Sequence, residues 1–267
     1  MLTMTKPNVN TLKKMIFDAA YKSKESHVGS ALSIIEIMYT LYFKVANISK
    51  ENINKPTRDK IILSKGHAAL AQYAALTMKG IINEKDFQTY ALNNGAVPAY
   101  VCKSINGIEV STGMSLGHGL GLAQGFAIAN RLDEIDSRIF VIVGDGELQE
   151  GSIYEALNSI SRMNLTEITI IIDKNEIQAS AKTRDIVDNS NLGERLSSMG
   201  FYVVESNGHN IDDLENALKI KSNRPLIVIA HTIKGHGCPK YENTVKSHYI
   251  KFDTDIYNNA ISTLEEN

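Results

Sequence analysis

The chain has 267 residues, 43% of them hydrophobic, and a formal net charge of −2 at pH 7. This length allows one large α/β domain with a full core, or two small domains. The near-neutral charge gives no electrostatic reason to expect nucleic acid or an anionic membrane as a partner. Because no repeat, low-complexity tract or Pro/Gly/Ser-rich linker divides the sequence, we predict a single domain over residues 1–267.

The N-terminal part is predicted to contain two helices joined by a turn. Residues 11–24 place apolar side chains at helical spacing on one face. The small residues of segment 26–33 favour a tight turn, and Ser33 could cap a second helix over residues 34–43. His27 lies in this turn and, read in isolation, is most simply an exposed loop histidine.

A short strand is predicted over residues 60–64, followed by an alanine-rich helix over residues 68–78. Lys65, Gly66 and His67 lie at the turn between them. A cation and a glycine at a strand-to-helix turn are suited to an anion. His67 could therefore face a phosphate, although it could also simply cap the helix.

Residues 83–110 show no regular periodicity, and a glycine-dense turn follows at residues 111–121. This turn opens an apolar helix predicted over residues 122–131. Three glycines within five residues could serve close packing of the helix on a sheet. Close approach of the backbone to a ligand is at least as good an explanation.

The most informative stretch is a predicted β-α-β unit in the middle of the chain. Two buried apolar runs, residues 140–143 and 170–172, end in polar residues that include Asp145 and Asn175, and residues 151–163 between them have helical spacing. The two strands would lie parallel, so both polar ends should emerge at the same edge of the sheet, where ligands bind in open α/β folds. Carboxylate and amide oxygens suit Mg²⁺ or Ca²⁺, and Mg²⁺ commonly binds together with a phosphate.

Each part of this unit has an ordinary structural explanation when taken alone. Gly144-Asp145-Gly146 could be a turn, and Asn175 could be a turn residue or a helix cap. The glycines would also allow the backbone to approach a diphosphate near the start of the next helix. A dinucleotide-binding fingerprint is excluded because the spacing is GxGxxxxG, and a P-loop is excluded because no GK[ST] follows.

The remaining strands complete an α/β pattern. Strands are predicted over residues 201–205 and 225–232, with a helix over residues 212–219 between them. Strands alternate with helices throughout, which predicts an α/β fold with a doubly wound, mainly parallel sheet. The segment 238–267 is polar and shows little periodicity, so no element is predicted there, and His248 has no helical or strand context.

Cysteine usage and the absence of sorting signals favour a cytoplasmic protein. Cys102 and Cys238 are the only cysteines and lack metal-ligand spacing, so a disulfide framework is not expected and a reducing compartment is consistent. The N-terminus has no signal-peptide core, and no apolar run is long enough to cross a membrane.

Seven motifs in a fixed order resemble those of the transketolase family. They are SHVGSALS, LSKGHAA, STG with SLGHGL, GDGELQEG, DKNEIQ, GFYVVESNGHN, and HTIKGHG followed by SHY. They run from about His27 to His248 and cover most of the chain. The sequence is similar to the N-terminal, diphosphate-binding half of transketolases, and more closely to the stand-alone N-terminal subunits of split transketolases. The resemblance implies a thiamine diphosphate-binding domain of the diphosphate (PP) type.

The resemblance also implies a role for individual residues. Mg²⁺, for which Ca²⁺ or Mn²⁺ could substitute, would be held by Asp145, Asn175 and the main-chain carbonyl of Ile177. The substrate would face His27, His67 and His248 as hydrogen-bond donors and proton relays. Thiamine diphosphate would be contacted by His67, Met114, Ser115, Leu116, Gly146, Glu147, Asn175, Lys234 and His248. Glu150 matches a glutamate at the family's subunit interface.

Three departures from the family pattern concern the substrate and the cofactor loops. A histidine that the family places before the Ser-Thr-Gly is missing, and Pro98-Ala99-Tyr100 occupies that region. The STGMSLGHG turn is one residue longer than usual, and Gln178-Ala179-Ser180 replaces the common Gln-Ile-Asp-Gly. The missing histidine leaves the donor and acceptor sugars open.

The resemblance implies transfer of a two-carbon ketol unit from a ketose, or its phosphate, to an aldehyde. In the family a glutamate from a separate pyrimidine-binding domain activates the cofactor, so we expect that domain on a partner chain, in an α₂β₂ assembly. Two alternatives remain open: the α subunit of a 2-oxoacid dehydrogenase, which shares the GDG…N unit, and a non-catalytic assembly or regulatory protein that retains the fold. The SKGHAA, SLGHGL and KGHG segments count against the first, and the intact Asp145, Asn175, His67 and Lys234 count against the second.

Overall fold

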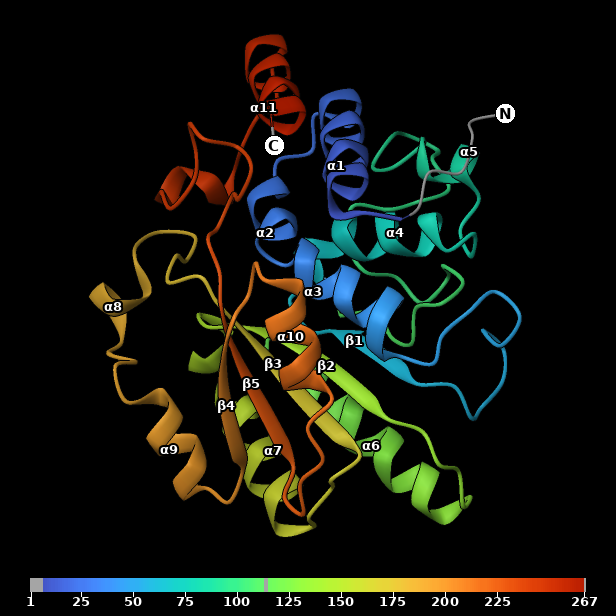
Figure 1. Ribbon diagram of the computed structural model, residues 1–267, viewed down its shortest axis with the longest axis vertical. Coiled ribbons are helices and arrows are strands. Elements are labelled where there is room, and N and C mark those ends of the chain that lie inside the picture. The colour runs from blue at the N-terminus through green and yellow to red at the C-terminus, as the bar shows by residue number, and fades with distance from the viewer. Residues whose placement is uncertain (1–6, 113–114, 267) are drawn as a thin grey trace.

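A five-stranded parallel sheet forms the centre of the computed structural model, which describes residues 7–112 and 115–266 (Figure 1). The strand order is β1-β2-β3-β5-β4, and every neighbouring pair is parallel. The strands are β1 (Lys60–Leu63), β2 (Ile139–Gly144), β3 (Ile168–Lys174), β4 (Tyr202–Asn207) and β5 (Leu226–His231). The predicted α/β fold with a doubly wound parallel sheet is confirmed.

The central strands are buried because helices cover both faces of the sheet. In β2, Phe140 and Ile142 pack into the core on one face, whereas Val141 and Val143 pack into the core on the other. Successive side chains of a strand point to opposite faces, so an unbroken apolar run is what a doubly covered strand requires. The edge strand β4 has mostly exposed or partly exposed residues.

One face of the sheet is covered by a large helical layer that also extends beyond the strand ends (Figure 1). Helices α3 and α10 pack against each other, and α10 lies on β4 and β5. This layer comprises α1 (Val9–Ser23), α2 (Val28–Ser33), α3 (Ile35–Thr40), the π-helix η1 (Leu41–Val45), α4 (Ala69–Met78), α10 (Ile211–Leu218) and α11 (Thr254–Glu266).

The opposite face carries α6 (Gly119–Leu132), α7 (Gly151–Arg162) and α9 (Leu192–Ser198). Helix α6 contacts β1, β2 and β3, and it also packs against α7. Short elements complete the described chain: α5 (Glu84–Phe87), α8 (Thr183–Ile186) and the 3₁₀ turns η2 (Gly66–Ala68), η3 (Glu147–Gln149) and η4 (Val245–His248). Within the described residues, none of the helices is both long and apolar enough to cross a bilayer.

The strand register aligns the polar ends of the strands. Gly144 pairs with Asp173, and Asp173 pairs with Ala230 on its other side. Asp145 and Asn175 therefore leave the sheet next to each other, and Thr232 follows on β5. All three lie at the carboxyl edge, where ligands bind in open parallel sheets.

Two local predictions were wrong. Segment 26–33 is not a turn, because residues 28–33 form helix α2, and Ser33 ends that helix instead of capping the next one. Residues 254–266 form helix α11, which packs on α1, and the stacked rings of Tyr21 and Tyr257 between the two helices have centroids 4.6 Å apart. Six-residue helices and terminal helices depend on such tertiary contacts more than on their own sequence.

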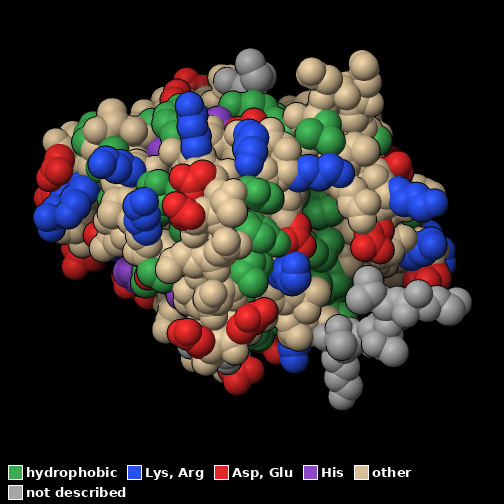
Figure 2. Space-filling view, turned by 90° about the horizontal axis from the view of Figure 1, so that it is seen from above, with side chains coloured by type: hydrophobic (Ala, Val, Ile, Leu, Met, Phe, Trp, Pro, Cys, Tyr) green, Lys and Arg blue, Asp and Glu red, His purple; other side chains and the backbone are tan. Residues whose placement is uncertain are grey.

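The surface carries no extended patch of one charge on the face in Figure 2, which is seen from above Figure 1. There, Lys and Arg side chains alternate with Asp and Glu among the described residues, and hydrophobic side chains form a band between them. This distribution agrees with the nearly balanced 28 basic and 30 acidic residues of the sequence. Both Cys102 and Cys238 are free.

Candidate functional site

A cavity of about 370 Å³ lies at the carboxyl edge of the sheet. Its walls come from the segments that follow β1, β2, β3 and β5, together with the start of α2 and the 3₁₀ turn η4. The predicted site residues that line it are His27, His67, Leu116, Asp145, Gly146, Glu147, Glu150, Asn175, Ile177, Lys234 and His248. Residues remote in the sequence therefore meet in one cavity because parallel strands deliver their ends to one edge.

Asp145 is a buried carboxylate, 3% exposed, at the end of β2. Its Oδ1 accepts a hydrogen bond from Gly146 N at 2.8 Å, and its Oδ2 accepts bonds from Glu176 N at 2.7 Å and Thr183 Oγ1 at 3.1 Å. Burial, followed by the negative charge of Asp173, raises the pKa of Asp145 to about 6. An ionised carboxylate in this environment gains from a nearby cation.

Asn175 and Ile177 are held beside Asp145 by a sharp turn after β3. Glu176 has φ of 59°, and its main-chain N–H points to Asp145. Asn175 donates to Asp173 through Nδ2 at 2.7 Å, so its Oδ1 faces the other way and accepts from Ile177 N at 3.0 Å. The set comprises a carboxylate, a carboxamide oxygen and a main-chain carbonyl, which are the hard donors that Mg²⁺ prefers. These residues fit the predicted metal.

Lys234 and Gln178 supply donors for an anion next to this oxygen set. Lys234 is buried, and its Nζ donates to the carbonyl of Ile177 at 2.8 Å and lies 3.0 Å from His248 Nδ1. Burial, together with the positive charge of Lys65, lowers the pKa of Lys234 to about 8. Gln178 Nε2 is buried without a hydrogen-bond partner among the described residues, and Gln178 lines the cavity. A diphosphate would satisfy both donors.

Three imidazole rings form a triangle in the cavity wall. The ring centroids lie 5.7 Å apart for His27 and His67, 5.5 Å for His27 and His248, and 5.6 Å for His67 and His248. Burial lowers the pKa of His67 well below its ordinary value, and burial with the charge of Lys234 lowers the pKa of His248 to about 3. His67 and His248 are therefore neutral near pH 7.

Several predicted residues have structural partners that the sequence did not reveal. The Oε1 of Glu147 accepts bonds from Ser64 and from Gly117 N, and its Oε2 accepts from Gly144 N, so this carboxylate ties the cofactor loops together. The exposed Ser115 contacts the His118 ring at 3.1 Å. Met114 lies outside the described residues.

Asp173 was missed as a site residue, although it is completely buried beneath the cavity. It forms an ion pair with Lys65 and accepts bonds from Ser33 Oγ at 2.6 Å, Thr232 Oγ1 and Asn175 Nδ2. Lys65, expected beside an anion, instead neutralises this carboxylate. The only sequence signal was an aspartate inside an otherwise apolar strand end.

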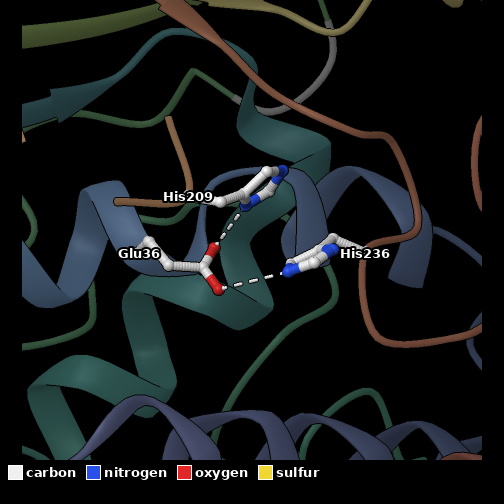
Figure 3. A group of neighbouring side chains, drawn as sticks. All are labelled: Glu36, His209 and His236. Atoms are coloured by element: carbon white, nitrogen blue, oxygen red, sulfur yellow. Dashed lines mark hydrogen bonds and ion pairs between the residues drawn. The ribbon is translucent and has the colours of Figure 1, made fainter. Parts of the chain in front are cut away.

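A second polar cluster supports the segment that carries Lys234. Figure 3 shows His209 and His236 on either side of the Glu36 carboxylate, with one ring directed at each oxygen. His209 Nδ1 lies 2.9 Å from Glu36, and His209 Nε2 accepts a bond from Ile233 N at 2.7 Å. Lys13 pairs with the same carboxylate at 2.8 Å. Because a lysine and a backbone donor already use these ligand atoms, the cluster is a hydrogen-bonded support instead of a cation site.

Tyr100 stands in the region of the missing histidine. It lines the cavity, and its ring centroid lies 5.7 Å from that of His27. The ring of Tyr249 also packs on His27, with centroids 5.0 Å apart, and this residue is 57% exposed. Two phenol rings therefore contact the first histidine of the triangle.

Comparisons with known proteins agree with this geometry. Residues 4–260 match the family described as the thiamine diphosphate binding domain of transketolase. One of the two subunits of the apulose-4-phosphate transketolase of Phocaeicola vulgatus is 31% identical over 257 residues, covering 95% of this chain and 91% of that protein. The 6-deoxy-6-sulfo-D-fructose transketolase subunit SqwG of Clostridium sp. is 32% identical over 261 residues, covering 96% and 94%.

Solved transketolases share the fold. The crystal structure of the Campylobacter jejuni transketolase superposes with a TM-score of 0.87 at 28% identity, and the match covers 96% of this chain but 42% of that one. The chain thus spans less than half of the solved enzyme that it matches. On the family match, the two subunit relatives and the shared fold, the chain belongs to the transketolase family, and residues 4–260 are its thiamine diphosphate binding domain.

Proposed function

We propose that the chain is the diphosphate-binding subunit of a split transketolase, which transfers a two-carbon ketol unit from a ketose to an aldehyde. One observation carries this proposal: the oxygen set of Asp145, Asn175 and Ile177 opens into the same cavity as Lys234 and the three histidines. A structural protein has no need for a buried carboxylate of raised pKa beside a buried lysine.

Asp145, Asn175 and the carbonyl of Ile177 would hold Mg²⁺, for which Ca²⁺ or Mn²⁺ could substitute. Lys234 and Gln178 would donate to the diphosphate, and Leu116 would lie beside the thiamine. Thiamine diphosphate, when bound, supplies the electron sink that makes cleavage of a carbon–carbon bond beside a carbonyl feasible. The protein binds it, orients it and sets the local electrostatics.

The histidine triangle would serve the substrate. His67 and His248 are neutral near pH 7, so each can donate one hydrogen bond to a hydroxyl or carbonyl oxygen without carrying a charge. His27 would face the same substrate from the start of α2. Transfer requires protons to leave and return to substrate oxygens, and imidazoles are suited to that exchange near neutral pH.

A separate subunit would complete the site. Two relatives that match over nearly their whole length are named as transketolase subunits, and the chain covers 42% of a solved transketolase. The activating glutamate and the pyrimidine pocket would come from the partner, in an α₂β₂ complex, with the exposed Glu150 near the interface. The cavity would then be closed from its open side.

The substrate should differ from those of ordinary pentose-phosphate transketolases. Tyr100 lines the cavity beside His27 and offers a phenol where the family pattern has an imidazole. A neutral hydrogen bond that is lost or changed alters binding by about 0.5–1.5 kcal/mol. The two subunit relatives are named for different sugars, which fits a site that varies at this position.

The proposal is tested by label transfer. The chain is mixed with the product of a neighbouring gene that encodes a pyrimidine-binding domain, and ketoses labelled with ¹³C at the first two carbons are offered with an aldehyde acceptor. Mass spectrometry should detect a product heavier by two labelled carbons. Release of labelled CO₂ from a 2-oxoacid without any such product would favour the dehydrogenase alternative and overturn the proposal.

A further inference from the structure

A carboxylate–histidine pair lies at the start of the histidine triangle. Glu25 follows the left-handed residue Lys24 that ends α1, and its Oε1 lies 2.9 Å from His27 Nδ1. The same oxygen accepts bonds from Ser26 N at 2.8 Å and His27 N at 3.4 Å. The side chains are 23% and 16% exposed, so the pair lies at the cavity wall and not on the open surface.

This geometry determines which nitrogen of His27 carries the proton. A carboxylate can only accept, so Nδ1 must be the donor and the neutral ring must be the Nδ1–H tautomer. The bond with His27 is the largest cause that lowers the pKa of Glu25 to about 2, so the carboxylate stays ionised near neutral pH. The lone pair of His27 Nε2 is therefore left as an acceptor, and no partner for it is present within residues 7–112 and 115–266.

His67 and His248 lack this arrangement. Nδ1 of His248 lies 3.0 Å from the ammonium of Lys234, which leaves Nε2 as the nitrogen that carries the proton. His67 is 5.6 Å from His248 between ring centroids, and the charges of Lys65 and Lys234 act against its protonation. His27 is thus the member of the triangle whose imidazolium form would have a carboxylate partner.

We propose that Glu25 is a positioning residue that fixes the Nδ1–H tautomer of His27 and makes His27 Nε2 the proton acceptor of the site. This inference rests on the proposed transketolase function. A ketose is cleaved when the hydroxyl on the departing carbon becomes a carbonyl. The O–H bond breaks, its proton moves to His27 Nε2, and its electron pair forms the second C–O bond.

The electron pair of the broken carbon–carbon bond stays with the two-carbon fragment, so charge and atoms balance without an oxidant. When the fragment joins the acceptor aldehyde, His27 returns the proton to the new hydroxyl oxygen. Glu25 stabilises the imidazolium between these two steps through the bond to Nδ1. The titratable groups that face His27 are Glu25 from the turn before α2, His67 from η2, Tyr100, and His248 and Tyr249 from η4 and the residue after it.

The test uses the complex of the chain with its pyrimidine-domain partner and two variants, Glu25→Ala and Glu25→Gln. The chain is labelled with ¹⁵N-histidine, and the nitrogen spectrum reports which ring nitrogen of His27 is protonated. Wild type should show protonated Nδ1. Glu25→Ala should lose this preference, and Glu25→Gln should keep it, because the amide oxygen still accepts but carries no charge.

The kinetic counterpart is a selective loss of turnover. We expect kcat to fall about 10- to 100-fold in Glu25→Ala, with a smaller fall in Glu25→Gln and little change in KM, since general acid–base groups contribute about 10²–10⁴ to rates. Glu205→Ala is the matched control, because Glu205 pairs with His231 at 2.7 Å outside the cavity. It should leave both the His27 signal and kcat unchanged.

An unchanged His27 tautomer in Glu25→Ala, or an unchanged kcat, would overturn the role of Glu25. Native signals from His209 in the same spectra show that the variant is folded. Failure of the proposed function gives a different pattern: the wild-type complex would transfer no label, while the ¹⁵N spectrum would still decide whether Glu25 sets the His27 tautomer.

Discussion

Replacement of Asp145 by asparagine isolates the charge that the cation site needs. The variant keeps the shape of the side chain and one oxygen, but it removes the only anionic member of the ligand set. Loss of one partner of a buried, paired charge costs about 3–5 kcal/mol, which corresponds to roughly two to four orders of magnitude in affinity. We therefore expect the Mg²⁺-dependent affinity of the assembled complex for thiamine diphosphate to fall at least 100-fold, on the order set by that cost.

The stability of the cation-free chain should change much less, because two effects oppose each other. The pKa of Asp145 is raised from 3.8 to about 6, so the ionised form costs the fold about 3 kcal/mol at neutral pH, and asparagine removes this cost. Asparagine also cannot accept all the bonds from Gly146, Glu176 and Thr183, and an unsatisfied buried donor costs about 1–3 kcal/mol.

Calorimetric titration with thiamine diphosphate, with and without Mg²⁺, measures the affinity, and denaturant unfolding of the chain alone measures the stability. Asp185→Asn is the control, because Asp185 lies in the exposed helix α8 and its carboxylate is 60% exposed. Wild-type affinity and unchanged Mg²⁺ dependence in Asp145→Asn would refute the assignment of the cation site.

Three further predictions concern pH, the supporting cluster and the C-terminal segment. Because the folded pKa of Asp145 is above its ordinary value, the unfolding free energy of wild type relative to Asp145→Asn should fall as pH rises from about 4 to 6 and then level off; a flat difference in denaturant melts would contradict this. His209→Phe should weaken cofactor binding about 5- to 10-fold in calorimetry, because Ile233 N loses its acceptor next to Lys234, whereas His231→Phe should have no effect. Phe252→Ala should lower the unfolding free energy by about 3–5 kcal/mol, because this ring is 1% exposed and stacks on Phe17; the 80% exposed Leu132 provides the Ala control, and equal losses in both variants would argue against the packing of the C-terminal segment on α1.

The sheet and the oxygen donors were predictable because parallel pairing leaves few alternatives. A short apolar run that ends in Asp145 or Asn175 must lie between two covered faces and expose its polar end at the carboxyl edge. The structure confirms that arrangement through the pairing of Gly144 with Asp173. The roles of His27, His67 and His248 came from the family resemblance, and the structure brings these residues together in one triangle.

The elements that were missed depend on contacts between distant segments. Helix α2 has six residues, too few to be stable alone, and it forms because Gly29 lets it pack directly against the backbone of Ser247. Helix α11 buries only Ile256 and Ala260, so its apolar stripe is weak in the sequence. The partner of Asp173 could not be predicted, because nothing local distinguishes Lys65 in an ion pair from Lys65 beside a phosphate.

The pairing of Glu25 with His27 was also invisible to motif comparison. The two residues are close neighbours in the chain, but the left-handed Lys24 is what redirects the backbone before them and lets the carboxylate meet the imidazole. Tyr100 became a site residue only when the loop before it was seen to enter the cavity. Both depend on loop conformation, which hydrophobic periodicity does not encode.

The most direct test of the proposed split enzyme combines light scattering with a carboligation assay on the same samples. The chain by itself, the pyrimidine-domain partner by itself and their mixture are each measured with thiamine diphosphate and Mg²⁺ present. We predict activity only in the mixture, at a mass that corresponds to two copies of each subunit. Full transketolase activity from this chain without the partner, at a mass that excludes any second subunit, would contradict it.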